Sequence, residues 1–303
     1  MHNFNRTGIK KSAKALAEGD FSEKNINDLH FLRKIRSNIF PIYFIEIQNA
    51  LKNFIYNFSG RLKRFETILR KLRRQSSDVT MMADIIGYRI IAPSISQQEL
   101  IINNLKKYFN KDFKDYRSRN DGYRAVHFNI EIEKDENGIP QVFEIQVRTI
   151  FQNIWSNYSE SYGEIIKEVK PSNNLGSDTE NIVKWLSLFS KKIYEFEEKN
   201  LDFIQNQIFL NLEKKKYFLF HYNKINKRIT AMDEFSNMQQ AIQFLDLHES
   251  LDIKNISANK NKEIILALSA SIDELKVTHP RFFNLDGRPI IPDEIFPGVL
   301  SPI

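Results

Sequence analysis

Two stretches of alternating apolar and polar residues, joined by a turn signal, constrain the fold of this chain most strongly. AVHFNIEIE (125–133) and VFEIQVRT (142–149) both have the period of two that is typical of half-buried strands. The intervening KDENGIPQ contains Asn-Gly, which favours a tight hairpin. ADIIGYRIIA (83–92) is apolar and rich in β-branched residues, which suits a central strand buried on both faces. The sequence therefore predicts a sheet built around these three strands.

The composition permits a large core and excludes several classes of protein. Of the 303 residues, 42% are hydrophobic, which is enough for two domains or for one domain with a sizeable appendage. No run of about 18 apolar residues predicts a membrane span, and the first twenty residues lack the apolar stretch of a secretory signal. The lack of cysteine excludes disulfides and thiolate zinc sites. We therefore expect a cytoplasmic protein that does not contact a membrane.

Positive charge favours an acidic partner, either nucleotide phosphates or a nucleic acid. The net charge is +6 and the pI is near 9.2. The charge is densest in RLKRFETILRKLRRQ (61–75), which we interpret as a helix with an apolar stripe of Leu62, Phe65, Leu69 and Leu72. The charged face of such a helix either contacts solvent or binds phosphates, and charge alone does not distinguish between these two roles.

The rest of the chain alternates helical patterns with a few strands. Helical spacing of apolar residues extends over 20–58, 94–110, 150–169 and 181–213. We expect a break near Pro41 in the first of these helices and a cap at Ser96 in the second. A turn-rich interruption over 170–180 separates the last two. A hairpin (215–235), a helix (238–249), a strand (262–270) and a helix (271–277) follow. We expect an α/β (α+β) fold, divided into an N-terminal helical segment (1–35), a central domain (36–205) and a C-terminal α/β appendage (206–303) with a regulatory or accessory role.

The polar face of the strand 142–149 has an unusual composition. It presents Glu144, Gln146 and Arg148, and the other face is apolar. Asp84 opens the apolar strand 83–92, so the two carboxylates converge if these strands are neighbours. Carboxylates a few ångströms apart repel each other unless a cation lies between them, and oxygen ligands suit Mg²⁺, which also reaches substrate phosphates. Arg148 could then hold a phosphate through two hydrogen bonds.

Each of these features also has a plain structural explanation. An acid at the start of a strand is usually a cap or a solvent contact, and a basic helix is usually a solvated face. Tyr123 lies beside Gly122 and could stack on a base, or it could pack at a strand edge. We interpret His127 as a satisfied structural histidine and Trp155 as a core residue. The residues alone indicate phosphate chemistry with a divalent ion as a hypothesis.

The order of four motifs adds a family resemblance to this interpretation. RLKRFETILRKLRR, DIIGYRII, DGYRAVHF, and FEIQVRT followed by QNIW occur in the order and spacing of the RelA/SpoT synthetase family, which residues 40–200 resemble. The resemblance implies a nucleotidyltransferase-like mixed sheet with flanking helices. It also implies a pyrophosphokinase that moves the β,γ-diphosphate of ATP to the ribose 3′-hydroxyl of GTP or GDP, which produces alarmones. ATP would be the donor and Mg²⁺ the cofactor.

The resemblance also assigns roles to individual residues. Asp84 would be a magnesium ligand, and Glu144 would be the second ligand and the group that activates the attacking hydroxyl. Tyr123 would stack on the guanine of the acceptor. The remaining nucleotide contacts would be, for ATP, Arg61, Lys63 and Lys71, and more generally Arg124, Gln146 and Arg148.

Departures from the family pattern leave the acceptor open. The chain has no His-Asp dipeptide, so we do not expect it to hydrolyse its product. Small alarmone synthetases typically place Glu-His after the tryptophan, and here Glu160 falls near the position of that histidine. This feature resembles the toxic small synthetases, some of which pyrophosphorylate the 3′ end of tRNA. A toxin or phage-defence effector acting on tRNA is therefore one alternative, and an inactive nucleotide- or RNA-binding regulatory module is another. Assembly into a homo-oligomer is also left open.

Overall fold

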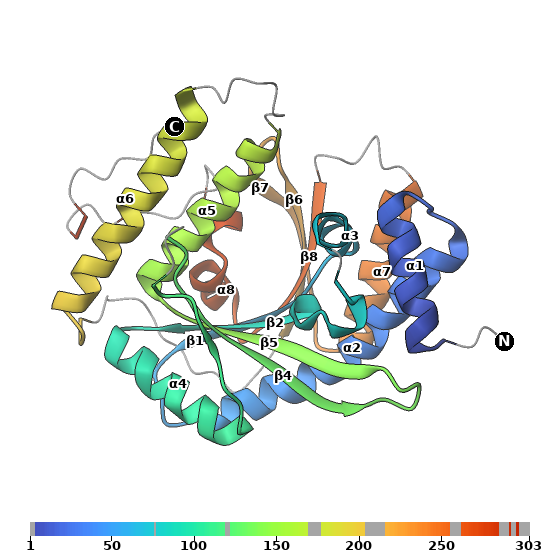
Figure 1. The fold of residues 1–303 in the computed structure, drawn as a ribbon, viewed down its shortest axis with the longest axis horizontal. Coiled ribbons are helices and arrows are strands. Elements are labelled where there is room, and N and C mark those ends of the chain that lie inside the picture. The colour runs from blue at the N-terminus through green and yellow to red at the C-terminus, as the bar shows by residue number, and fades with distance from the viewer. Residues whose placement is uncertain are drawn as a thin grey trace.

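One mixed sheet of eight strands organises the molecule (Figure 1). The computed structural model describes residues 4–75, 77–118, 122–168, 177–203, 216–254, 262–284, 291 and 295–296. The strands are β1 (Asn57–Leu62), β2 (Ile86–Ala92), β3 (Lys114–Asp115), β4 (Val126–Lys134), β5 (Pro140–Thr149), β6 (Lys216–Asn223), β7 (Arg228–Phe235) and β8 (Lys262–Ser269). Their order is β3-β4-β5-β2-β1-β8-β6-β7, with β2 and β5 parallel and the other neighbours antiparallel. The fold is thus α+β with a mixed sheet, as the sequence predicts.

Helices cover both faces of the central strands (Figure 1). They are α1 (Arg6–Glu18), α2 (Glu23–Ala50), α3 (Phe65–Arg74), α4 (Ile95–Phe109), α5 (Ile150–Glu168), α6 (Ser177–Lys199), α7 (Met238–Lys254) and α8 (Ile272–Thr278). Ile90 of β2 is buried in a cluster with α2 and α4, whereas Ile91 is buried in a cluster with α5 and α6. Since successive strand residues point to opposite faces, α2 and α4 cover one face and α5 the other.

The predicted hairpin is confirmed and orients the polar residues of β5. β4 and β5 pair with His127 opposite Gln146, and Gly138 of the connecting turn has a φ of 70°, the left-handed conformation that the Asn-Gly turn favours. Phe143 and Ile145 are buried in the cluster beneath α2 and α4. Glu144, which alternates with them, therefore points to the α5 face of the sheet.

The predicted helix 61–75 is wrong at its N-terminal end. Arg61 and Leu62 belong to strand β1, and the helix starts at Phe65. β1 is a central strand that is paired with β2 on one side and with β8 on the other. These partners are remote in sequence, so local periodicity does not reveal them, and the tertiary pairing outweighs the helical pattern.

Two details of the predicted helices also need correction. α2 is not broken at Pro41, because it continues through this residue to Ala50. A proline inside a helix costs about 3 kcal/mol, and the burial of Phe40 and Phe44 on the sheet holds the helix together despite this cost. The cap of α4 is Ser94 and not Ser96, since the Ser94 side chain accepts a hydrogen bond from the backbone N–H of Gln97.

The C-terminal strands extend the same sheet. β8 pairs with β1 from Ser59 opposite Ser269 to Leu62 opposite Leu266, and β6 and β7 continue outward from β8. The hairpin, helix, strand and short helix that the sequence predicts in this region are all present. The division of the chain near residue 205 into a central and an accessory domain stays a prediction.

Some predicted segments lie partly outside the described residues. Residues 170–176 of the turn-rich interruption and 204–213 of the predicted helix 181–213 lie outside the described residues. Where the structure describes these segments, both bounds need correction, because α6 begins at Ser177 and ends at Lys199. Within the described ranges, no helix combines the length and the apolar character that crossing a bilayer requires.

Candidate active site

The parallel pairing of β2 with β5 brings the two predicted acids to the N-terminal end of β2, in the middle of the sheet. Asp84 lies in a short 3₁₀ turn (Ala83–Ile85) directly before β2, and Gly87 of β2 is aligned with Glu144 of β5. A Cβ atom at Gly87 would meet nothing within 4 Å, so there is open space on that side of Glu144. The charge of Asp84 acts on the Glu144 carboxylate and opposes its ionisation. The structure thus brings the two acids close enough to interact.

Asp84 is held by two lysines and keeps one oxygen available. Its Oδ2 accepts hydrogen bonds from Lys63 Nζ at 2.6 Å and from Lys71 Nζ at 2.9 Å. Its Oδ1 is buried and has no hydrogen-bond partner among the described residues. Burial alone would raise the pKa of Asp84, but Lys63 and Lys71 lower it overall. A buried, ionised oxygen without a partner fits a hard cation such as Mg²⁺.

Glu144 is the centre of a hydrogen-bond network. Its Oε1 lies 2.9 Å from His127 Nδ1, and its Oε2 accepts a hydrogen bond of 2.5 Å from Gln146 Nε2. Burial would raise the pKa of Glu144, as would the charge of Asp84, but the hydrogen bonds from His127 and Gln146 and the charge of His127 lower it overall. Glu144 is therefore an oriented carboxylate that stays ionised at neutral pH.

The network continues from His127 to an arginine at the end of β5. His127 Nε2 lies 2.7 Å from the Tyr123 hydroxyl, which accepts a hydrogen bond of 2.8 Å from Arg148 Nη2. Arg148 is only 2% exposed, so it supports the Tyr123 ring and faces little solvent itself. His127 is satisfied, as the sequence predicts, but it belongs to the site. Its place on the polar side of β4, opposite Gln146, was the signal that could have revealed this.

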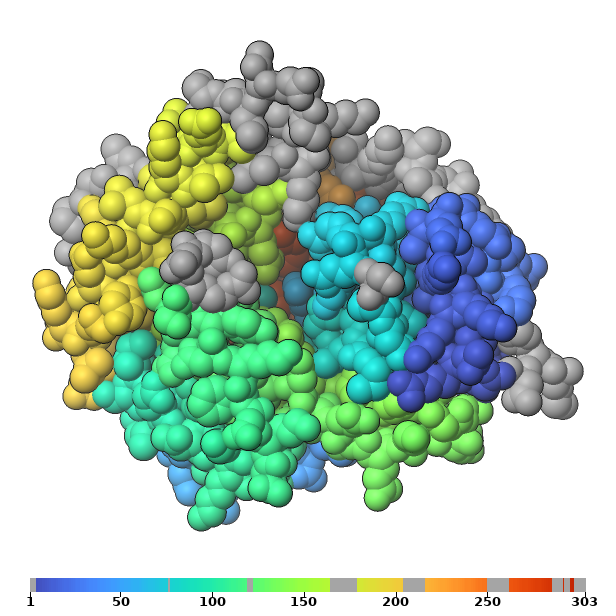
Figure 2. All heavy atoms as spheres, in the orientation of Figure 1, coloured from blue at the N-terminus to red at the C-terminus, as the bar shows by residue number. Residues whose placement is uncertain are grey.

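A cationic cleft that opens to solvent lies beside Asp84, because Lys63, which pairs with Asp84, also lines the cleft. We call it the cationic cleft; its described charged lining residues are Arg61, Lys63, Arg64, Arg70, Arg74, Glu160 and Arg281. In Figure 2 it is visible as a hollow between α3, in cyan, and α5, in yellow-green, with red atoms of the C-terminal part at its base. Burial opposes ionisation of Glu160, but Arg281, Arg61 and Arg89 lower its pKa to about 2. The excess of cations over this carboxylate suits a polyanionic ligand.

The structure does not bring all the predicted contacts to this cleft. Arg124 turns toward α6, where its Nε donates to Ser190 Oγ at 2.9 Å and its guanidinium lies 4.7 Å from the centre of the Tyr194 ring. Lys71 reaches Asp84 and Gln146 reaches Glu144, so both lie at the acids. The roles that the sequence assigns to these residues in nucleotide binding stay predictions.

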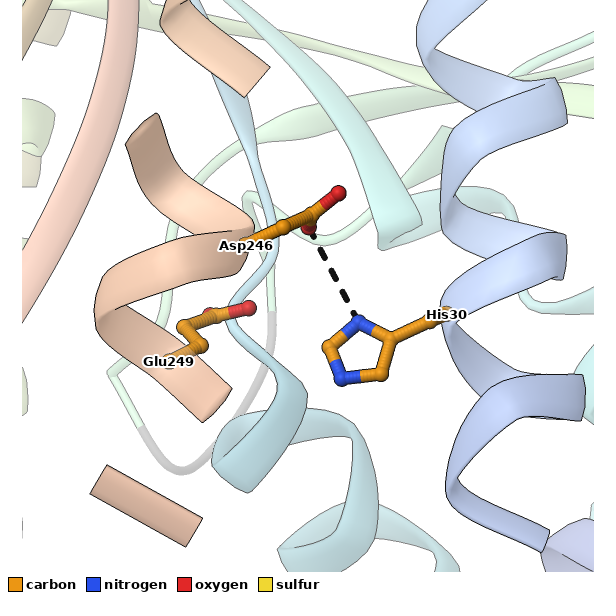
Figure 3. Close-up of side chains that lie close together, drawn as sticks. All are labelled: His30, Asp246 and Glu249. Carbon is orange, nitrogen blue, oxygen red and sulfur yellow. Dashed lines mark ion pairs between the residues drawn. The ribbon is translucent and has the colours of Figure 1, made fainter. Parts of the chain in front are cut away.

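A second cluster of potential metal ligands lies on the far side of α3. His30, Asp246 and Glu249 present nitrogen and oxygen atoms within 4.8 Å of one another (Figure 3). Arg33 already supplies a cation here, since its Nη1 pairs with Glu249 Oε2 and lies 4.0 Å from Asp246 Oδ1. Glu249 Oε1 accepts a hydrogen bond of 3.3 Å from the backbone N–H of Phe65. The cluster is therefore explained as an ion-pair network that fixes α7 to α2 and to the start of α3.

Comparison with known proteins finds a family match for part of the central region. Residues 60–162 match the family model described as "Region found in RelA / SpoT proteins". We refer to residues 60–162, which match this model, as the RelA/SpoT region. It contains Asp84, Glu144, the network around Glu144 and most of the cationic cleft.

Two curated relatives show how far the likeness extends. The GTP pyrophosphokinase YwaC of Bacillus subtilis (strain 168) is 34% identical over 118 residues, which is 35% of this chain and 56% of the relative. The uncharacterized protein Rv1366 of Mycobacterium tuberculosis is 31% identical over 137 residues, or 40% of this chain and 48% of the relative. The chain thus spans about half the length of the curated relatives that it matches.

Solved structures give a more distant likeness. Small alarmone synthetase 1 from Bacillus subtilis, bound to its product pppGpp, has a TM-score of 0.45 and 22% identity, over 54% of this chain and 90% of that chain. Small alarmone synthetase 2 from the same organism has a TM-score of 0.44 and 23% identity, over 58% and 96% of the two chains.

Proposed function

We propose that the protein is a magnesium-dependent pyrophosphokinase that transfers the β,γ-diphosphate of ATP to the ribose 3′-hydroxyl of GTP or GDP. The observation that supports this most is the pair Asp84 and Glu144 beside the cationic cleft, one with an unpartnered buried oxygen and the other held ionised. Diphosphate transfer mainly requires positioning and neutralisation of charge, and this site offers both. The RelA/SpoT region and the likeness to a protein named GTP pyrophosphokinase agree with this type of reaction.

The donor would bind in the cationic cleft. Arg61, Arg70 and Arg74 line it, and guanidinium groups are suited to phosphate oxygens. Lys63 is shared between the cleft and Asp84, so it connects the phosphates to the acids. Asp84 and Glu144 would hold Mg²⁺, which would neutralise negative charge on the phosphate oxygens.

The transfer itself is a single displacement at phosphorus. The acceptor 3′-oxygen forms a bond to the β-phosphorus of ATP, and the bond from that phosphorus to the oxygen bridging to the α-phosphorus breaks. AMP leaves with the bridging oxygen and its electron pair, and the acceptor gains the diphosphate. The proton of the 3′-hydroxyl goes to a Glu144 oxygen, which His127 and Gln146 hold in a fixed orientation.

A radiochemical assay tests this proposal and distinguishes the acceptors. The full chain is incubated with γ-labelled ATP and Mg²⁺, with GDP, GTP, ATP or deacylated tRNA in separate reactions. We expect label on GDP or GTP, and none when EDTA removes Mg²⁺. Label on tRNA alone would favour the tRNA-modifying effector. No label on any acceptor would contradict the enzyme and favour a regulatory module.

Substitutions at the acids connect the activity to this site. Glu144→Gln removes the proton acceptor, and Asp84→Asn removes the ionised oxygen, so each should reduce transfer by at least about 100-fold while the melting temperature stays close to that of the wild type. Glu131→Gln is the matched control, because Glu131 lies on the same side of the hairpin and is exposed. A Glu144→Gln variant with the wild-type rate would remove Glu144 from the mechanism.

A further inference from the structure

Residues of the C-terminal part line the cationic cleft. Arg281 and Phe282, in a 3₁₀ turn (Pro280–Phe282) after α8, line the cationic cleft together with Ile265 of β8. These residues are more than one hundred positions beyond the end of the matched RelA/SpoT region at residue 162. Figure 2 shows red atoms of the C-terminal part at the base of the hollow between α3 and α5. The C-terminal part therefore forms one wall of the cleft.

A buried carboxylate fixes the Arg281 side chain. Glu263 of β8 is 1% exposed, and its Oε2 accepts a hydrogen bond from Arg281 Nη2 at 3.3 Å. Its Oε1 lies 2.8 Å from Nη2 of Arg64, a cation that comes from the RelA/SpoT region. The Arg281 guanidinium also lies over the Phe282 ring, 4.4 Å from its centre. Glu263 thus holds two arginines from distant parts of the chain at one wall of the cleft.

The charge around Arg281 indicates a ligand that carries several negative charges. Nη1 of Arg281 lies 3.7 Å from Glu160 Oε2, and Arg89 Nη2 lies 3.8 Å from Glu160 Oε1. Both distances are longer than a hydrogen bond, so Glu160 reduces the positive charge of the cleft without forming a hydrogen bond through these atom pairs. Six cations and Glu160 line the described part of the cleft, and Glu263 and Asp84 pair with three of these cations, Arg64, Arg281 and Lys63. Phosphates of a nucleotide would suit the positive charge that Arg61, Arg70 and Arg74 add beside Arg281.

We propose that Arg281 binds the phosphates of the donor nucleotide, and that Glu263 positions it for this task together with Arg64. The inference rests on the proposed function, because it makes the C-terminal part a contributor to the ATP site of the pyrophosphokinase. Arg281 would form charge-assisted hydrogen bonds to phosphate oxygens that displace the Glu160 carboxylate from its vicinity.

Direct binding of ATP and steady-state kinetics test the inference. Arg281→Ala should weaken ATP binding on the order of ten- to a hundredfold and raise KM for ATP, while KM for the acceptor stays within about twofold. Arg281→Lys keeps the charge and should recover part of the affinity. Glu263→Gln should weaken ATP binding less than Arg281→Ala, because it disturbs the position of the guanidinium without removing it. Lys276→Ala is the control, because Lys276 is an exposed cation of α8 that pairs with Asp273. It should leave the affinity for ATP and KM for ATP unchanged.

The outcomes separate this inference from the function on which it rests. A purely structural Arg281 would change the melting temperature and leave the affinity of the folded variant for ATP unchanged, and that result would overturn the inference alone. Arg281→Lys provides the same comparison if Arg281→Ala does not fold. If the wild type neither binds ATP nor transfers diphosphate, the proposed function fails and this inference fails with it.

Discussion

A buried carboxyl group on α6 allows a quantitative prediction about stability and pH. Glu197 is 6% exposed; its carboxyl group contacts the Thr149 hydroxyl and accepts a hydrogen bond from Gln152 Nε2 at 3.1 Å. Burial raises the pKa of Glu197 from 4.5 to about 7, although these two hydrogen bonds act to lower it. Between pH 4.5 and about 7, the folded chain therefore keeps a proton that the unfolded chain has already released.

The sign of the effect follows from this difference in bound protons. Between pH 4.5 and about 7 the folded state binds more protons at Glu197 than the unfolded state does, so the free energy of unfolding decreases as the pH rises through this window. One pKa unit corresponds to about 1.4 kcal/mol, and ionised Glu197 therefore costs the folded protein about 3 kcal/mol at pH 8. Glu197→Gln keeps the shape of the protonated side chain and should remove this cost.

Urea unfolding at pH 5 and at pH 8 measures the prediction. Glu197→Gln should be close to the wild type at pH 5 and more stable by up to about 3 kcal/mol at pH 8, with an unchanged denaturant slope. Glu195→Gln changes an exposed glutamate of the same helix and should alter stability by less than about 0.5 kcal/mol at both pH values. Equal stability of Glu197→Gln and the wild type at pH 8 would refute the reasoning.

Three further predictions follow from the packing and from the site. Gly60→Ala should destabilise the protein by about 1–3 kcal/mol in urea unfolding, because a Cβ atom would lie 2.5 Å from Cε2 of Phe40; an unchanged midpoint would contradict this contact. His127→Ala should move the acidic limb of the pH–rate profile to higher pH, since burial then raises the pKa of Glu144 without His127 to lower it; an unmoved limb would separate His127 from the reaction. A chain truncated after residue 203 should aggregate or unfold more easily, because it exposes the edge of β1; soluble truncated protein with full activity would disprove the role of β8.

The parts of the fold that local patterns encode could be predicted from the sequence. Strict alternation in β4 and β5 and the Asn-Gly turn between them fix the hairpin and its register, and a one-residue slip would turn Glu144 into the apolar cluster beneath α2 and α4 and Phe143 toward the α5 face. The same alternation places Glu144 and Gln146 on one face. Together with an apolar strand that opens with Asp84, this was enough to predict two acids that approach each other.

Contacts between remote segments could not be predicted in this way. Arg61 was assigned to a helix because its sequence neighbours have helical spacing, and only pairing with β2 and β8 makes it part of a strand. The hydrogen bond from Arg281 to Glu263 and the ion pair of Glu263 with Arg64 depend on where β8 joins the sheet. No local pattern contains that information, so the wall of the cleft that the C-terminal part provides is visible only in the structure.

The position of β8 also changes how the C-terminal part can act on the site. A separate regulatory domain would affect the cleft through a movable interface, but β8 forms backbone hydrogen bonds with β1, the strand that carries Arg61. α7 adds a second connection, because Glu249 accepts a hydrogen bond from the backbone N–H of Phe65, where α3 begins. Both elements that hold the cations of the cleft are therefore fixed by C-terminal residues. Any signal received by this part of the chain would reach Arg61 and α3 through these direct contacts, without a rearrangement of the RelA/SpoT region itself.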